Sequence, residues 1–364
     1  MLRRIIPLAL LAAVLLAGCT TPGSVAEEAP ERALEPLVPL SELETLANPA
    51  GYFGESTAVL RQEAIEPIAE DPQPQLPVTV VDAQGTKVTV RDASRILTVD
   101  IYGSLSATVF GLGLGDRVVG RDTSTSFPGS SELPLVTQNG HELNAEAILD
   151  LAPTVILTDT SVGPWDVILQ MRESGIPVVV TDSHRDMDNV DDIILQVAEA
   201  LGVPEEGQAL AERVQGEIDD KIAEIAAIAP TEPADRVRML FLYVRGTAGI
   251  YYMFGEGSGA DSLIEALGGV DVATEVGWKG MRPVNAEALV QMEPDLLIMM
   301  TKGLESVDGV DGLLERVPAV ANTPAGMNRR IVDMSDYVVL SFGPRTADVL
   351  DALARAVYAP ECAG

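Results

Sequence analysis

Histidine and tyrosine are the side chains of this sequence best suited to bind a transition metal, and one of each stands at a distinctive place. The 364 residues include only two histidines. His141 lies in TQNGHELNAEAILDLAPTVILT (137–158), between a glycine and a predicted helix. Tyr243 stands near the end of the apolar run MLFLYV, and Arg245 follows two positions later. Imidazole nitrogen and phenolate oxygen both bind ferric iron, so the two residues are candidates for an iron site.

The spacing of Tyr243 and Arg245 favours ionisation of the tyrosine phenol. In an extended chain, side chains two positions apart point to the same side. A guanidinium beside a phenol lowers the pKa of the phenol from its ordinary value near 10, because it favours the anionic form. The alternative is a tyrosine packed on the core next to a solvated arginine, and spacing alone does not separate the two interpretations.

The surroundings of His141 are repeated later in the chain. NAEAILDLAPTVIL (144–157) returns 141 positions on as NAEALVQMEPDLLI (285–298), and Arg282 takes the place of His141. Each copy predicts a helix followed by an apolar strand, so the repeat indicates two similar α/β lobes. We therefore expect both segments before the helices to face a shared cleft.

Alternating strands and helices support this α/β fold class. In the first half we predict a hairpin with a turn at 83–85 and strands at 95–100, 154–158 and 177–182, with a helix at 165–175. In the second half we predict strands at 237–244, 294–300 and 330–339, and helices at 259–269 and 344–358. The predicted fold is two similar α/β lobes joined by a long spine helix, with the ligand cleft between the lobes.

The predicted domain boundaries follow from these elements and from composition. The segment between the two halves has apolar residues at spacings of three and four, which predicts a helix. Ahead of the first hairpin the chain is rich in Pro, Glu and Ala, which is typical of a flexible spacer with at most a short helix near 41–46. The predicted divisions are a signal peptide (1–18), an anchored flexible linker (19–75), a first lobe (76–186), a spine helix (187–230) and a second lobe (231–364).

The N-terminus predicts export and a lipid anchor. Arg3 and Arg4 precede an apolar run that is too short to span a bilayer, which is the pattern of a signal peptide. The run ends in LAGC, which resembles a bacterial lipobox, and this resemblance implies cleavage before Cys19 and attachment of diacylglycerol to its thiol. The alternative is an ordinary signal peptide with an incidental cysteine. If Cys19 carries lipid, the other cysteine, Cys362, has no disulfide partner.

Charge excludes one class of partner. The formal net charge is −31, from 55 acidic and 24 basic residues. Such a chain repels phosphate backbones, so we expect no nucleic-acid partner.

The order of these elements resembles the lipoprotein substrate-binding components of ABC importers, in the class that carries haem, siderophores and cobalamin. The resemblance covers about residues 76–360. Its markers are RILTVD followed by SATVFGLGLGDRVVG, the two NAEA units and the long helical segment. It implies a protein that is not an enzyme and that captures its ligand in the cleft between the lobes.

Within this class, the candidate metal ligands favour haem. Free ferric iron usually calls for several protein ligands, whereas a porphyrin supplies four and leaves two axial positions. Similarity to the hemin-binding lipoproteins of bacterial haem importers implies that His141 and Tyr243 are the axial ligands, supported by Arg245. Trp278 stands where that subfamily often has a further pocket tyrosine, and Lys279 and Arg282 are expected to pair with the propionates. The ligand-binding residues expected are Arg245, Tyr251, Tyr252, Phe254, Trp278, Lys279, Met281 and Arg282.

The same resemblance implies partners and a location. Glu146 and Glu287, at equivalent places in the repeat, would dock on a permease that works with an ATPase, although a glutamate in a first helical turn is also favourable for the helix by itself. We expect a monomer on the extracytoplasmic face, held to the membrane only by lipid on Cys19.

Three alternatives remain open from sequence. A siderophore or cobalamin binder of the same class needs no His–Tyr pair. A two-lobed metalloenzyme or oxidoreductase would be a different class, but the sequence contains no G-x-S-x-G, H-E-x-x-H or P-loop motif. A surface adhesin could keep the fold without a ligand. We expect the second histidine, His184, to lie at the surface.

Overall fold

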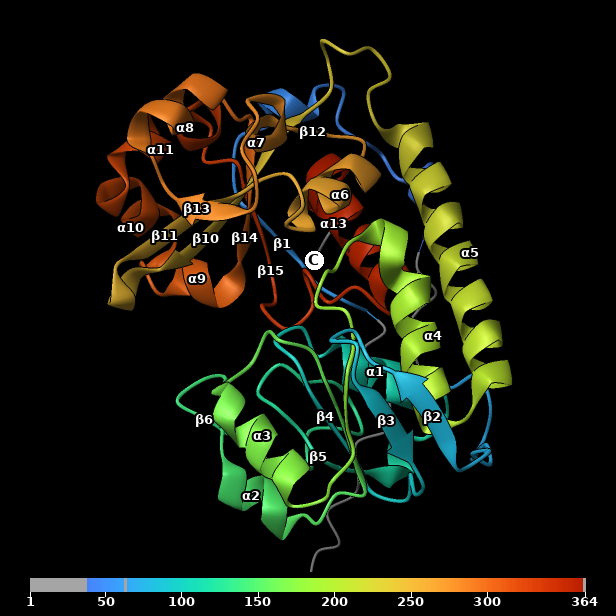
Figure 1. Cartoon of the computed structure of the whole chain (residues 1–364). Coiled ribbons are helices and arrows are strands. Elements are labelled where there is room, and N and C mark those ends of the chain that lie inside the picture. The colour runs from blue at the N-terminus through green and yellow to red at the C-terminus, as the bar shows by residue number, and fades with distance from the viewer. Residues whose placement is uncertain (1–37, 62–63, 363–364) are drawn as a thin grey trace, which may run out of the picture. The chain divides into compact units, whose positions relative to one another are not determined.

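The first lobe is built on a four-stranded parallel sheet. The structure, a computed structural model, describes residues 38–61 and 64–362 (Figure 1). The strand order is β5 (Val118–Gly120), β4 (Ile96–Val99), β8 (Val155–Thr158), β9 (Val178–Val180), and the helices are α1 (Ser104–Gly111), α2 (Ala145–Asp150) and α3 (Trp165–Glu173). Every residue of β4, β8 and β9 is buried, as expected when helices cover both faces of a parallel sheet. The strands predicted around these positions are confirmed.

Two short hairpins accompany this sheet. β2 (Val78–Val81) and β3 (Lys87–Val90) pair antiparallel around the predicted turn. β6 (Thr137–Gln138) and β7 (Glu142–Leu143) form a second hairpin, directly before α2.

The second lobe is built on a mixed seven-stranded sheet in which the order β1-β15-β14-β10-β11-β13 is completed by β12 pairing with β10. The strands are β1 (Ser56–Ala58), β10 (Arg238–Arg245), β11 (Ile250–Phe254), β12 (Val270–Asp271), β13 (Met281–Pro283), β14 (Leu296–Met300) and β15 (Ile331–Met334). The helices are α6 (Ala260–Ala266), α7 (Val272–Glu275), α8 (Ala286–Met292), α9 (Thr301–Glu305), α10 (Gly309–Arg316), α11 (Pro318–Ala321), α12 (Pro324–Met327) and α13 (Thr346–Tyr358). The strand predicted over 330–339 is shorter than expected, because it ends at Met334.

The side chains of strand β10 alternate between two apolar cores, and this alternation determines which way Tyr243 points. Met239 and Phe241 belong to the core that contains α6 and α13, whereas Leu240 and Leu242 belong to the core under α8 and α10. Successive side chains of a strand point to opposite faces. Tyr243 therefore continues the row of Met239 and Phe241 past the edge of the core.

The segment 187–230 is not the single spine helix that we predicted. It contains α4 (Val190–Leu201) and α5 (Pro204–Ile228), which pack side by side (Figure 1). Gly202 ends α4 with a left-handed backbone (φ 72°), and Pro204 occupies the first turn of α5, where its missing N–H costs nothing. A glycine and a proline two positions apart are a helix stop and a helix start. The long connecting helix is thus α5 alone, with 25 residues.

The flexible linker predicted over 19–75 is also wrong for the residues that the structure describes. Strand β1 pairs in parallel with β15, so that Ser56 lies opposite Val332 at the edge of the second sheet. Leu40 is completely buried, in a 3₁₀ turn where a short helix was expected near 41–46. Further on, the Ile68 N–H donates to the Gly111 carbonyl in the first lobe. Residues 38–58 therefore belong to the second lobe, which the boundary at 231 does not include, while the signal peptide and Cys19 lie outside the described residues.

One apolar core runs through both lobes. It includes Ile96 and Leu105 of the first lobe, residues of α4, α5 and α13, and Phe241 of the second sheet. Within the described part of the chain, no helix has the length and apolar character needed to cross a membrane.

Candidate ligand-binding site

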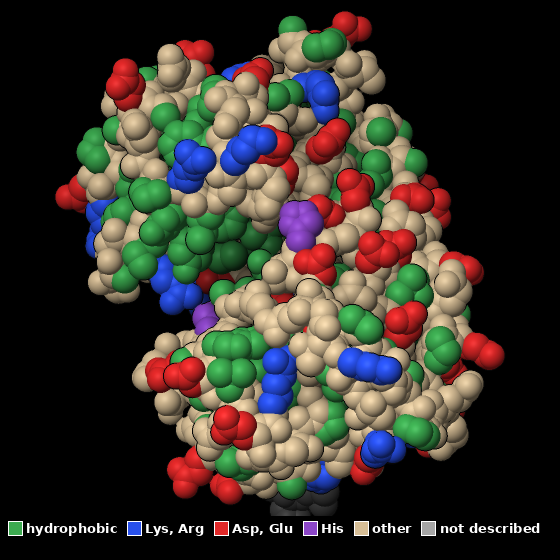
Figure 2. All heavy atoms as spheres, in the orientation of Figure 1, with side chains coloured by type: hydrophobic (Ala, Val, Ile, Leu, Met, Phe, Trp, Pro, Cys, Tyr) green, Lys and Arg blue, Asp and Glu red, His purple; other side chains and the backbone are tan. Residues whose placement is uncertain are grey.

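Two adjoining hollows lie between the lobes, and Tyr243 lines both. The apolar hollow, about 460 Å³, is lined by Ile101 and Tyr102 from the first lobe and by Phe254, Met281 and Met300 from the second, among others. The polar hollow, about 360 Å³, includes His141, Arg245, Lys302 and Tyr337 in its lining. Ile101, Tyr243, Met300 and Asp336 line both, so the two hollows form one cleft. Figure 2 shows hydrophobic side chains gathered in this cleft and basic side chains at one margin.

His141 reaches the cleft from the turn of the β6–β7 hairpin. Asn139 and Gly140 both have positive φ, 48° and 94°, which tightens this turn. The imidazole is partly buried, and its Nδ1 is buried without a hydrogen-bond partner among the described residues. Burial, followed by the nearby charge of Arg245, lowers the pKa of His141 below its ordinary value. At neutral pH the ring is therefore neutral, which is the form that binds metals.

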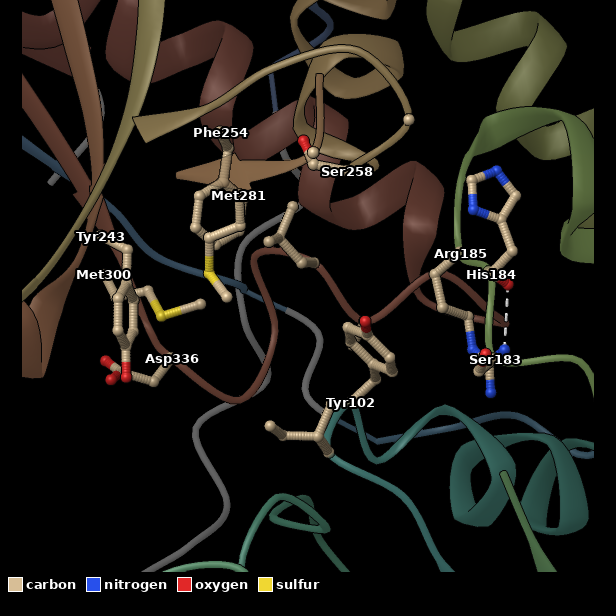
Figure 3. Close-up of a pocket in the computed structure, with 15 residues that line it drawn as sticks. Tyr102, Ser183, His184, Arg185, Tyr243, Phe254, Ser258, Met281, Met300 and Asp336 are labelled. Carbon is tan, nitrogen blue, oxygen red and sulfur yellow. Dashed lines mark hydrogen bonds between the residues drawn. The ribbon is translucent and has the colours of Figure 1, made fainter. Parts of the chain in front are cut away.

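Tyr243 and Arg245 leave the end of β10 on the same face, as predicted from their spacing. The Arg245 guanidinium carbon lies 5.8 Å from the centroid of the Tyr243 ring. On the other side, the Phe254 ring lies 6.2 Å from Tyr243 and 5.0 Å from Phe241, centroid to centroid. Figure 3 shows Tyr243, Phe254, Met281 and Met300 around the apolar hollow. Tyr243 thus has an aromatic neighbour on one side and a cation on the other.

Several side chains predicted to contact the ligand line neither hollow. Trp278 packs against the core under α8, and the Arg282 guanidinium lies 5.8 Å from its ring centroid. Lys279 is paired with Glu256, with 2.9 Å between Nζ and Oε2. The residues that the structure places outside both hollows are Tyr251, Tyr252, Trp278, Lys279 and Arg282.

The symmetry argument for Arg282 fails for a local reason. His141 stands in a hairpin turn, whereas Arg282 lies within β13 and pairs with Met253 of β11. The two copies of the repeat agree only from the helix cap onward. The side chains of Asn144 and Asn285 each accept hydrogen bonds from the N–H groups of the second and third helical residues. What precedes the cap differs between the lobes.

The structure adds cleft residues that the sequence reasoning missed. Tyr102 follows β4, Arg185 follows β9, Lys302 follows β14 and Tyr337 follows β15. Ligands of parallel α/β sheets bind beyond the carboxyl ends of the strands, and all four residues occupy such positions. This rule, applied to every predicted strand, was the signal that could have found them.

Buried acids hold the wall of the first lobe in place. Asp100, Asp122 and Asp159 follow β4, β5 and β8, and all three are completely buried. Burial raises the pKa of Asp100 to about 7 and that of Asp122 to about 6, and it also raises the pKa of Asp159. Arg185 neutralises part of this charge, since its Nη2 lies 3.0 Å from Asp159 Oδ2.

This network positions Tyr102. The guanidinium of Arg185 lies 5.4 Å from the centroid of the Tyr102 ring. Asp100, two residues before Tyr102, accepts hydrogen bonds from the N–H and hydroxyl of Ser104. The loop that carries Ile101 and Tyr102 is thus fixed at both ends, which makes the floor of the apolar hollow rigid.

His184 is at the surface, as predicted, and also at the rim of the apolar hollow (Figure 3). Its side chain is 47% exposed, and its Nε2 lies 2.6 Å from Asp186 Oδ2. Among the described residues, no group of three or more His, Cys, Asp and Glu side chains is arranged to hold a metal ion.

The family model of periplasmic binding proteins matches residues 99–338, most of both lobes. The chain belongs to the periplasmic binding protein family. It is a substrate-binding protein of transport, and not an enzyme.

Known proteins with this architecture include haem binders. A crystal structure of the heme-binding protein HmuT is 41% identical, with a TM-score of 0.81, and the match covers 86% of this chain and 99% of that one. The periplasmic heme-binding protein RhuT from Roseiflexus sp. RS-1 is 36% identical, with a TM-score of 0.67 and coverage of 75% and 100%. An uncharacterized ABC transporter substrate-binding lipoprotein of Bacillus subtilis (strain 168), YvrC, is 25% identical over 287 residues, 78% of this chain and 86% of that protein.

Further HmuT structures carry alanine in place of a single histidine, tyrosine or arginine. The replaced tyrosine and arginine are two positions apart in that chain. Tyr243 and Arg245 have the same spacing here.

Proposed function

We propose that this protein captures ferric haem outside the membrane and delivers it to an ABC permease. The observation that carries the proposal is the placement of His141 and Tyr243, from opposite lobes, in the lining of one hollow. Similarity at 41% identity to a heme-binding protein supports it. A siderophore or cobalamin ligand would not need this His–Tyr pair.

The chemistry of the two side chains suits the axial positions of haem. The porphyrin supplies four nitrogens, so one imidazole and one phenolate complete six-coordinate iron. His141 is neutral at neutral pH and needs to lose no proton before it binds. Tyr243 would bind the iron through its phenolic oxygen, and the guanidinium of Arg245 lies beside its ring.

The remaining walls suit a flat apolar ring. Phe254, Met281 and Met300 from the second lobe and Tyr102 from the first line the apolar hollow (Figure 3). Ile101 of the first lobe also belongs to its lining. Binding pockets for molecules of this kind are mostly apolar with a few placed polar groups. A porphyrin held through its iron at Tyr243 would lie between these walls.

Delivery would use the two equivalent glutamates. Glu146 and Glu287 are both exposed and both follow an asparagine cap by two positions, on α2 of the first lobe and α8 of the second. We propose that they dock on basic residues of the permease, which works with its ATPase. The protein would act as a monomer on the extracytoplasmic face, with lipid on Cys19 as its membrane anchor.

A hemin titration of the soluble chain, residues 20–364, tests the proposal. Wild type should develop a Soret band with one-to-one stoichiometry at micromolar protein. His141→Ala and Tyr243→Phe should each shift the band and weaken binding by tenfold or more. Tyr252→Phe is the matched control, because this tyrosine of the same lobe lines neither hollow. A flat wild-type titration would overturn the haem assignment in favour of a siderophore or a corrinoid.

A further inference from the structure

The lysines of this chain differ in whether a carboxylate neutralises their ammonium group. Four lysines occur in the chain, and two of them, Lys221 and Lys279, are paired with carboxylates. Lys302 forms no ion pair with residues 38–61 or 64–362, and it faces the polar hollow. In a protein of net charge −31, Lys302 is thus an exposed cation in the ligand cleft that no carboxylate of the described residues neutralises.

The two other cations that line the cleft, Arg185 and Arg245, contact groups of the protein itself. Arg185 is 2% exposed and donates to Asp159, to Ser104 and to the backbone carbonyls of Asp182 and His184. Arg245 lies over the Tyr243 ring. Lys302 is therefore the cation of the polar hollow that is neither held by a carboxylate nor placed over the proposed iron ligand.

Tyr337 holds the ammonium group of Lys302 while leaving donors available. Lys302 Nζ donates to the Tyr337 hydroxyl and lies 4.1 Å from the centroid of that ring. An ammonium has three donors and a phenol has one, so two ammonium hydrogens and the phenolic hydrogen remain for a ligand. Together they match the oxygens of a carboxylate, with a charge-assisted hydrogen bond from the lysine.

This pair stands on a fixed base. Lys302 follows β14 and Tyr337 follows β15, and these strands are parallel neighbours. The Thr301 hydroxyl donates to Asp333 Oδ2 at 2.6 Å, and the Lys302 N–H donates to Asp336 Oδ2 at 2.9 Å, which ties the two loops together. Asp336 also lines both hollows and repels anions, so attraction of a carboxylate at this place needs the cations of the polar hollow, Lys302 and Arg245.

We propose that Lys302 and Tyr337 bind a carboxylate of the ligand, and that they orient it in the cleft. The inference rests on the proposed function, in which the ligand is haem and the carboxylates are its propionates. The propionate edge then lies in the polar hollow, and the opposite, apolar edge lies among Phe254, Met281 and Met300 in the apolar hollow. Lys279 and Arg282, expected from sequence to have this role, point elsewhere.

Comparison of hemin with hemin dimethyl ester tests the inference, because the ester keeps the iron and the ring but lacks the negative charges. Wild type should bind hemin about tenfold more tightly than the ester. Lys302→Gln should lose about tenfold in hemin affinity with no change for the ester. Tyr337→Phe should lose about threefold, and Lys302→Arg should keep most of the preference. The Soret maximum of the complexes should not move, since the axial ligands are intact.

Lys279→Gln is the matched control, a lysine of the same lobe that is paired outside the cleft. If Lys302→Gln binds hemin as wild type does, or loses hemin and ester affinity equally, the carboxylate assignment is overturned while haem binding stands. If wild type shows no Soret band with either compound, the proposed function itself fails and this inference fails with it.

Discussion

The imidazole of His141 and the phenol of Tyr243 share one charged neighbour, Arg245, and this arrangement should set the pH range of ligand binding. Burial and the charge of Arg245 both lower the pKa of His141. Both effects keep the imidazole of His141 neutral when the solution becomes mildly acidic.

We therefore predict that Arg245→Leu raises the pH at which hemin is released. Without the guanidinium, His141 takes up a proton at higher pH, and a protonated imidazole does not bind the iron. The Soret absorbance of the complex, followed from pH 8 to pH 5, measures the midpoint. Arg282→Leu, which removes an arginine that stacks on Trp278 outside both hollows, should leave the midpoint unchanged. Equal midpoints in Arg245→Leu and wild type would contradict the assignment.

The buried aspartates of the first lobe lead to a second prediction, which concerns the pH dependence of the free energy of unfolding. The pKa of Asp100 is raised to about 7 by burial, then by the charges of Asp122 and Asp159, so between about pH 4 and pH 7 the folded chain binds a proton that the unfolded chain has lost. The free energy of unfolding contributed by this group falls as pH rises through that window, by about 1–4 kcal/mol. Asp100→Asn should reduce the fall, measured by urea unfolding at pH 5 and pH 7.5. The same substitution at the exposed Asp150 should not reduce it, and a pH dependence unchanged in Asp100→Asn would argue against the raised pKa.

At the scale of elements, β1 is the part of the fold most at odds with composition. It adds an edge strand to the second sheet, and it brings Ser56 to the buried guanidinium of Arg330, 2.8 Å from Oγ to Nη1. Burial lowers the pKa of Arg330 to about 10, and its guanidinium donates to the Ser56 hydroxyl and to the carbonyls of Ala356 and Val357. The aromatic ring of Tyr52, from the same segment, lies 4.7 Å from its guanidinium carbon.

A chain that begins at residue 76 should therefore be less stable than one that begins at residue 38. Removal of β1 uncovers the β15 edge and takes partners from a buried charge, which typically costs about 3–5 kcal/mol. Urea unfolding of the two chains measures the difference. The two midpoints would coincide if the segment before residue 76 were only a spacer.

At the scale of the whole molecule, the two lobes share one apolar core along α4, α5 and α13. Each lobe carries an exposed glutamate at the same place in its repeat, Glu146 in the first and Glu287 in the second. We expect this common core to keep the separation of the two carboxylates nearly constant, which would suit recognition by one permease.

Charge reversal at both positions, Glu146→Arg with Glu287→Arg, should abolish haem uptake into proteoliposomes that contain the permease and its ATPase. Hemin affinity should stay within about twofold of wild type, because neither residue lines a hollow, and loss of a first-turn glutamate costs each helix only about 0.3–1 kcal/mol. Reversal of two other exposed glutamates, Glu173 on α3 and Glu315 on α10, is the control for net charge. Uptake at the wild-type rate by the double variant would remove these glutamates from the docking surface.

Much of this architecture could be predicted from sequence alone because it depends on neighbours along the chain. The NAEA units carry their own helix caps, the alternating and continuous apolar runs mark strands, and the two-residue step from Tyr243 to Arg245 places both side chains on one face. Even the break at Gly202 and Pro204 was present as a local signal, although we predicted one helix there. The pair His141 and Tyr243 was accessible for the same reason, since each stands at the end of a recognisable element.

What only the tertiary structure decided depends on pairing between distant segments. β1 is recognisable as a strand only beside β15, which lies more than 270 residues later. Arg282 precedes a predicted helix and Lys302 follows a predicted strand, so the sequence places both beside recognisable elements. Pairing of β13 with β11 turns Arg282 away from the cleft, whereas the parallel pairing of β14 with β15 brings Lys302 to Tyr337. Periodicity determines which face of an element a side chain occupies, and long-range packing determines whether that face meets core, solvent or the opposite lobe.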